Sequence, residues 1–195
     1  MKGTVHYEVK DGVAILTVDN PPVNPLSDGV RAGFVNNIDK AENDPDVLGV
    51  VLTGAGRSFI AGADISEFGK NPDGPGLDEA FRKLEFCSKP VVAAINGSAL
   101  GGGLETALVC NYRIAGPAAF VGLPEVNLGL LPGAGGTQRL PRLVGPAEAL
   151  KMMLTGMHVN AKKALSMGII DQVSDDLIND SIKFIQKVSS ETQNH

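Results

Sequence analysis

Apolar residues occur in short runs along this chain, and glycine or proline separates most of the runs. Residues 5–9 and 13–18 lie on either side of Asp11-Gly12, a pattern that predicts a β-hairpin. Continuous apolar runs at 48–53 and 90–95 predict strands that are covered on both faces. From Ser27 onward, apolar residues recur at a spacing near 3.6, which predicts a helix of about four turns.

Helical spacing continues later in the chain. Helices are expected at 77–87, 104–108, 147–154, 161–167 and 177–188, with another that contains Leu140 and a short strand at 169–173. Because strands alternate with helices, the pattern predicts an α/β fold with crossover connections and with loops gathered at the strand ends. A length of 195 residues suits a single domain over 1–195.

Small residues mark the segments between these elements. Residues 54–64 are expected to form a loop that leads into a helix start at 65–68. Residues 71–76, Asn-Pro-Asp-Gly-Pro-Gly, are the most loop-like stretch, and we expect mobility there near an entrance. Two glycine-rich turns, at 101–103 and 133–136, each precede a predicted helix.

The composition limits the class of protein. Hydrophobic residues make up 43% and charged residues 20%, as in folded globular chains. A formal net charge of −5 without a long basic run argues against nucleic acid as a partner. No apolar run is long enough to span a membrane, and the N-terminus has no signal-peptide pattern, so a cytoplasmic location is expected. Cys87 and Cys110 each lie in apolar sequence and are expected to be free thiols.

Several common catalytic motifs are absent from the sequence. No Gly-x-x-x-x-Gly-Lys-Ser/Thr phosphate loop occurs, and the run that begins at Gly133 lacks the third glycine of the dinucleotide motif. The segment Gly56-Arg57-Ser58-Phe59-Ile60 lacks the final glycine of a serine-hydrolase elbow. The three histidines have no metal-ligand spacing, so no metal site is expected.

Two glutamates are the candidate chemistry. Glu105 follows Gly101-Gly102-Gly103 in the first turn of a helix, and Glu125 lies among Val121, Leu123, Val126 and Leu128 with no basic neighbour. The glycine turn could present free N–H groups to a carbonyl oxygen, or it could merely allow close packing, and the turn alone favours neither. Glu105 alone could serve only to stabilise the helix dipole. Two carboxyl groups in contrasting surroundings, however, are typical of paired acid/base catalysis.

Four ordered blocks carry a family resemblance that extends over nearly the whole chain. The blocks are residues 61–65 (AGADI), 96–105 (NGSALGGGLE), 124–125 (PE) and 132–140 (PGAGGTQRL). Together they resemble the crotonase (enoyl-CoA hydratase/isomerase) superfamily. Residues 21–24 (PPVN) and 122–126 (GLPEV) are most similar to the N-terminal hydratase/isomerase module of multifunctional fatty-acid oxidation enzymes.

The resemblance implies an α/β fold with a crotonase-like ββα spiral core and a shortened C-terminal helical extension. It implies an oxyanion hole, formed by the backbone N–H groups of Ala63 and Gly102, for the thioester oxygen of an acyl-CoA. Glu105 and Glu125 would hold and activate one water, which adds to the β-carbon of a trans-2-enoyl-CoA in β-oxidation. No cofactor is implied, because coenzyme A enters as part of the substrate. Contacts with CoA or substrate are expected from Ala61, Gly62, Ala63, Asp64, Ile65, Gly101 and Gly133.

The residues themselves agree with this division of roles. A carboxyl group beside a helix N-terminus is expected to stay ionised, so Glu105 suits the base that orients water. An apolar wall favours a protonated carboxyl, so Glu125 suits the proton donor. The main alternative is a Δ3-Δ2-enoyl-CoA isomerase that uses Glu125 alone, and decarboxylase, thioester-hydrolase and non-catalytic RNA-binding proteins on the same scaffold are further alternatives.

The sequence departs from the family pattern at three places. Pro25 follows Asn24 where many members have a small residue, and Asn111 replaces a common aspartate. The chain also ends soon after residue 188, whereas single-function members continue with helices that pack a trimer and cover the acyl pocket. Assembly into a homo-oligomer, a trimer or hexamer, is therefore left open, as is the alternative that the chain is a fragment of a longer multifunctional enzyme.

Overall fold

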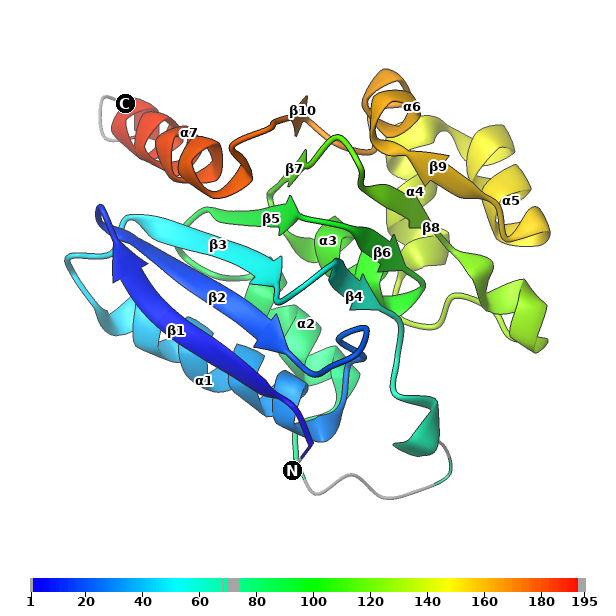
Figure 1. Ribbon diagram of the computed structural model, residues 1–195, viewed down its shortest axis with the longest axis horizontal. Coiled ribbons are helices and arrows are strands. Elements are labelled where there is room, and N and C mark those ends of the chain that lie inside the picture. The colour runs from blue at the N-terminus through cyan, green and yellow to red at the C-terminus, as the bar shows by residue number, and fades with distance from the viewer. Residues whose placement is uncertain (1, 68, 70–73, 193–195) are drawn as a thin grey trace.

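A computed structural model describes residues 2–67, 69 and 74–192 of the chain (Figure 1). The predicted hairpin is confirmed: β1 (Thr4–Lys10) and β2 (Val13–Asp19) pair antiparallel. Next to β2 lie the parallel strands β3 (Gly49–Gly54), β5 (Val91–Ile95), β7 (Tyr112–Ala115) and β10 (Gln172–Val173). These six strands form one sheet in the order β1-β2-β3-β5-β7-β10.

A second, smaller sheet contains four short strands in the order β4-β6-β8-β9: β4 (Ser58–Ala61), β6 (Ser98–Leu100), β8 (Phe120–Gly122) and β9 (His158–Asn160). The expectation of a loop over 54–64 is therefore wrong at β4. Strands of three or four residues are too short to show an alternating pattern, and the small residues around them favour a loop interpretation.

The two sheets are built together by a repeating path. β3 is followed by β4 and helix α2 (Leu77–Glu85), β5 is followed by β6 and helix α3 (Gly102–Val109), and β7 is followed by β8. Each turn thus adds one strand to the large sheet and the next strand to the small sheet. This is a ββα spiral, as predicted.

Helices cover both faces of the large sheet (Figure 1). Helix α1 (Asp28–Asn43) packs on one face with α2, and helix α7 (Leu177–Thr192) packs on the other. Alternate residues of β2 follow this division, since Val13 and Ile15 belong to the core under α7 and Leu16 belongs to the larger core under α1. Burial on both faces explains why the run at 48–53 is continuously apolar.

The remaining helices extend beyond the small sheet: α4 (Gly136–Val144), α5 (Pro146–Thr155) and α6 (Ala161–Ser166). Two 3-10 helices, η1 (Ile65–Glu67) and η2 (Pro124–Leu128), follow β4 and β8. The predicted helix start at 65–68 is thus a three-residue η1, with residue 68 outside the described part. Residues 71–73 of the predicted mobile loop also lie outside it. Among the described helices, none is both long enough and apolar enough to cross a bilayer.

Candidate active site

Three parallel strands of the small sheet end at one edge, and the predicted site residues follow them. The 61–63 turn follows β4, Gly101 and Gly102 follow β6, and Glu125 lies in η2 just after β8. Neighbouring strands pair in parallel, β4 with β6 and β6 with β8, so their carboxyl ends lie side by side. This edge is where open α/β sheets commonly bind ligands.

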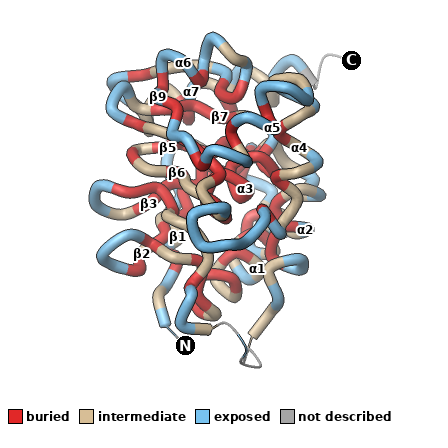
Figure 2. Tube along the Cα trace, turned by 90° about the vertical axis from the view of Figure 1, so that its right-hand side faces the viewer, coloured by how far each residue is buried: buried red, intermediate tan, exposed pale blue. Residues whose placement is uncertain are grey.

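The glycine turn has the packing role that the sequence left open, and its role toward a carbonyl oxygen stays a prediction. Gly101 caps α3 with a φ of 53°, in the left-handed region that favours glycine. A Cβ on Gly103 would lie 1.8 Å from the carbonyl oxygen of Ile60, so this glycine permits α3 to pack directly on β4. Every residue of α3 is buried (Figure 2). Glu105 therefore lies inside the protein.

Glu105 is held by the start of a different helix. Its Oε1 accepts hydrogen bonds from the backbone N–H groups of Ala134 (2.9 Å) and Gly136 (2.8 Å), at the N-terminus of α4. Burial raises the pKa of Glu105 above its usual value, and these two amides and the charge of Arg139 only partly oppose that effect. The sequence placed Glu105 beside its own helix start and expected it to stay ionised. The amides come instead from α4, and burial works against the ionised form.

The carboxyl of Glu125 is close enough to Glu105 to be affected by its charge. Burial raises the pKa of Glu125, and the negative charge of Glu105 raises it further. Its Oε2 is buried and has no hydrogen-bond partner within the described residues. A carboxyl oxygen in that position favours the protonated state, and the donor role of Glu125 stays a prediction.

The predicted apolar wall around Glu125 is only half present. Val121 and Leu123 are buried, but Val126 and Leu128 are 38% and 61% exposed. The sequence could not distinguish these pairs, because the exposed residues lie in the short η2, where no periodicity marks the outward face.

The amide groups expected to form the oxyanion hole lie close together. A Cβ on Gly102 would lie 3.4 Å from the backbone nitrogen of Ala63. Ala63 is held in place by a bridge to Leu26, whose N–H donates to the carbonyl of Gly62 at 2.9 Å. Gly102 begins α3, and the first N–H groups of a helix have no acceptor within the helix.

One cavity of about 450 Å³ joins these groups. Its remaining lining is mainly apolar, with contributions from Leu100, Leu128, Leu130 and Leu131. The predicted site residues that line it are Ala61, Gly62, Ala63, Ile65, Gly101, Gly102, Glu105, Glu125 and Gly133. Glu105 and Glu125 therefore share one cavity with the glycine turn and the 61–63 turn.

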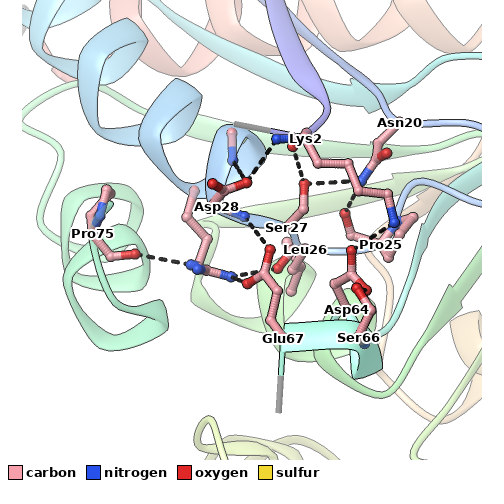
Figure 3. A network of polar contacts seen from close by, with 12 residues as sticks. Lys2, Asn20, Pro25, Leu26, Ser27, Asp28, Asp64, Ser66, Glu67 and Pro75 are labelled. Atoms are coloured by element: carbon pink, nitrogen blue, oxygen red, sulfur yellow. Dashed lines mark hydrogen bonds and ion pairs between the residues drawn. The ribbon is translucent and has the colours of Figure 1, made fainter. Parts of the chain in front are cut away.

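Asp64 is the predicted site residue that does not line this cavity. Its carboxylate instead accepts hydrogen bonds from Lys2 Nζ (3.0 Å), from the backbone of Ser66 (3.0 Å) and from Ser66 Oγ (2.6 Å), as Figure 3 shows. The Ser66 hydroxyl, the amide and Lys2 hold the pKa of Asp64 below its usual value. Asp64 therefore shapes the turn next to the cavity.

Arg31 supports the same region and was missed by sequence reasoning. Its guanidinium is buried and donates to the carbonyls of Leu26 (2.8 Å) and Pro75 (2.9 Å) and to Glu67 Oε2 (2.8 Å). Glu67 Oε1 also accepts from the N–H of Asp28. Arg31 thus connects α1 with η1 and with the approach to α2. A single arginine within a helical pattern gives no signal of such a role.

Within the described part of the chain, no group of three or more His, Cys, Asp or Glu side chains is placed to hold a metal ion. Cys87 and Cys110 are free, as expected.

Comparison with known proteins identifies the family. Residues 8–195 match the family described as enoyl-CoA hydratase/isomerase. The chain belongs to this family. It is 53% identical over 170 residues to a peroxisomal bifunctional enzyme of Danio rerio (87% of this chain, 24% of the relative). It is 48% identical over 182 residues to a glyoxysomal fatty acid beta-oxidation multifunctional protein of Brassica napus (88% and 25%).

Solved structures agree with the fold. A crystal structure of enoyl-CoA hydratase from Bacillus anthracis superposes with a TM-score of 0.86 at 33% identity, covering 97% of this chain and 77% of that one. The α/β crotonase fold is therefore confirmed, and so is the resemblance to multifunctional β-oxidation enzymes. The chain spans about a quarter of the length of the two multifunctional relatives. Names that include "peroxisomal" or "glyoxysomal" belong to those relatives, and the cytoplasmic location of this chain stays a prediction.

Proposed function

We propose that the chain is an enoyl-CoA hydratase that adds water to a trans-2-enoyl-CoA and yields a 3-hydroxyacyl-CoA in β-oxidation. One observation carries the proposal: two glutamates in contrasting surroundings line the same cavity as the 61–63 turn and the start of α3. One carboxyl accepts two amide hydrogen bonds, and the other has a buried oxygen without a partner. This asymmetry suits a base and an acid acting on one water.

In the proposed mechanism, the amides of Ala63 and Gly102 bind the thioester oxygen and stabilise the negative charge that develops there. Glu105, with Oε1 fixed by α4, accepts a hydrogen bond from the water and directs its oxygen at the β-carbon. Glu125 provides the proton that reaches the α-carbon, and the proton lost by the water restores the carboxyl pair. The product thus gains the oxygen and one hydrogen of the water and the proton of Glu125, while the second proton of the water passes to the carboxyl pair and reprotonates Glu125 for the next turnover. The net reaction is the addition of one water, and no redox step is needed.

The second candidate is a Δ3-Δ2-enoyl-CoA isomerase. The unpartnered Oε2 of Glu125 favours it, because one carboxyl could remove and return a proton without a water. The hydrogen bonds from backbone N–H groups that fix Glu105 favour the hydratase, since an isomerase needs no second oriented carboxylate.

The two candidates make different products, so one set of assays separates them. Purified protein is incubated with C4, C10 and C16 trans-2-enoyl-CoA and with a 3-enoyl-CoA in deuterated buffer. The hydratase predicts 3-hydroxyacyl-CoA from at least one trans-2-enoyl substrate. Isomerisation of the 3-enoyl-CoA without hydration of any trans-2-enoyl-CoA would replace the hydratase by the isomerase. The mass of the protein in solution, measured alongside, shows whether the chain assembles into a trimer or hexamer, which the sequence left open.

A further inference from the structure

Arg139 of α4 joins helix α2 to the turn over residues 133–136. Its Nε and Nη2 donate to the two carboxylate oxygens of Glu85 in α2, at 3.0 and 2.7 Å. Such a forked pair fixes the plane of the guanidinium. The third nitrogen, Nη1, donates to the carbonyl of Ala134 at 3.1 Å. The side chains of Arg139 and Glu85 are only 26% and 34% exposed, so the pair is shielded from solvent.

The Ala134 that Arg139 contacts is the residue that holds Glu105. Ala134 donates its N–H to Glu105 Oε1 while its carbonyl accepts from Arg139. The second hydrogen bond to the same oxygen comes from the backbone N–H of Gly136. Between them, Gly135 has a φ of 102°, and a Cβ on it would lie 1.9 Å from Arg139 Nη1. The turn is therefore built around the guanidinium, and the Glu105 carboxylate is fixed by that turn.

The charges near Glu105 are few. Arg139 comes from α4, Glu125 from η2, and Glu85 of α2 approaches through its pair with Arg139. Strands β4 and β6, which pack against α3, carry no ionisable side chain. Arg113 of β7 lies at the far end of α3, where it donates to the Cys110 carbonyl. Among the described residues, Arg139 is thus the cation that acts on Glu105, and its charge lowers the pKa of that carboxyl against the effect of burial.

We propose that Arg139, held by Glu85, is a positioning residue that fixes the 133–136 turn and thereby aims the Glu105 carboxylate at the reacting water. The role in turnover rests on the proposed hydratase function, whereas the effect on the Glu105 carboxyl does not. Arg139 touches neither substrate nor water in this account, and it acts only through Ala134 and Glu105.

The test compares Arg139→Met, Arg139→Lys and Glu85→Gln with the wild type. The control is Arg142→Met, which removes the same charge from the same helix. Within the described part of the chain, the one hydrogen bond of the Arg142 side chain goes to the Gln138 carbonyl. Two quantities are measured: kcat and KM as functions of pH, and the titration of the Glu105 carboxyl carbon by ¹³C NMR, assigned by its absence in Glu105→Gln. The NMR titration needs no substrate.

For Arg139→Met we expect a loss in kcat on the order of 10²-fold, the cost of a misplaced catalytic group, with KM little changed. The NMR midpoint of Glu105 and the acidic limb of the pH profile should both move to higher pH. Arg139→Lys keeps the charge, so its Glu105 titration midpoint should lie close to that of the wild type. Its kcat should still be lower than that of the wild type, because lysine cannot form the forked pair. Glu85→Gln leaves the Arg139 charge without its counter-ion, so the midpoint should move in the opposite direction while kcat falls. Arg142→Met should match the wild type in both quantities.

An Arg139→Met protein that is folded and has unchanged kcat and an unchanged Glu105 midpoint would overturn the proposal. If Arg139→Met does not fold, Glu85→Gln and Arg139→Lys decide: an unchanged Glu105 midpoint in Glu85→Gln together with an unchanged kcat in Arg139→Lys would overturn it. If the wild type proves not to hydrate enoyl-CoA, the NMR titration still shows whether Arg139 controls Glu105. Failure of the proposed function is therefore distinguishable from failure of this inference.

Discussion

Gly101 leaves free the space next to the Glu125 carboxylate: a Cβ on Gly101 would lie 3.2 Å from Glu125 Oε1. Gly101 also has a φ of 53° and donates its N–H to the Gly122 carbonyl at 2.9 Å, which ties the start of α3 to the end of β8. The glycine that shapes the turn before Glu105 therefore also sets the position of Glu125. The two carboxyl groups are coupled by the backbone as well as by charge.

Replacing Gly101 by alanine should lower kcat strongly and lower the free energy of unfolding only moderately. The left-handed φ costs about 1–2 kcal/mol for an alanine, and the new Cβ would push the Glu125 carboxylate aside. We expect a loss of kcat on the order of 10²-fold. The matched control is Gly56→Ala, which has a φ of 71° and nothing within 4 Å of its Cβ. It should show a similar loss of stability in denaturant titration with kcat unchanged. Equal kcat values for the two variants would contradict the coupling.

Gly103→Ala should be severely destabilising. Its Cβ would lie 1.8 Å from the Ile60 carbonyl oxygen, so α3 would have to move away from β4. The expected loss is roughly 3 kcal/mol in the free energy of unfolding, the upper part of the range for overpacked cores. Gly76→Ala, with no neighbour within 4 Å of its Cβ, should cost less than about 1 kcal/mol in the same denaturant titration. Similar unfolding midpoints for both variants would show that α3 does not depend on this close approach.

Glu125→Gln should stabilise the protein at neutral pH. The folded pKa of Glu125 is raised, so folding favours the protonated carboxyl and its ionisation costs stability as pH rises through the folded pKa. An amide avoids that cost, and because the carboxyl is partly exposed we expect a gain of only about 0.5–1 kcal/mol at pH 7. The gain should vanish below the unfolded pKa of about 4.3. Thermal unfolding at several pH values measures it, and a gain that is independent of pH would exclude this cause.

Asp64→Asn should destabilise the protein with the opposite pH dependence. The folded pKa of Asp64 is lowered, so its contribution is present above the unfolded pKa of about 3.9 and is lost as pH falls through the folded pKa. The expected cost at pH 7 is about 1 kcal/mol, because the partner Lys2 is largely exposed. Binding of an acyl-CoA, followed by calorimetry, should change little. A large loss of affinity with unchanged stability would instead return Asp64 to the substrate site.

Much of the large sheet could be predicted from the sequence. Long apolar runs and the Asp11-Gly12 turn give a clear local signal, and the structure confirms the hairpin, α1 and the continuously buried β3. The small sheet could not be predicted by pattern, since strands such as β6 contain three residues. The ββα spiral came from the family resemblance, which the ordered motifs made specific.

Most of the candidate site was also predictable, but its supporting contacts were not. Glu105 and Glu125 stand out in the sequence because burying a carboxyl group among apolar residues costs free energy. The partners of Glu105 lie 29 and 31 residues further along the chain, and Arg31 acts on carbonyls that no pattern marks. At Asp64 a motif position suggested a ligand contact, which stays a prediction, whereas its hydrogen bond to Lys2, 62 residues earlier in the chain, has no local signal in the sequence.

The most direct test of the account is a double-mutant cycle on hydration of C4 trans-2-enoyl-CoA, with Glu105→Gln, Glu125→Gln and the double variant. If both carboxyl groups act on one water, each single change should lower kcat by roughly 10²–10⁴-fold. The double variant should then be hardly slower than the worse single variant, because residues that act as a unit are not additive. Losses that multiply in the double variant, or a near-wild-type rate for Glu125→Gln, would contradict the shared water.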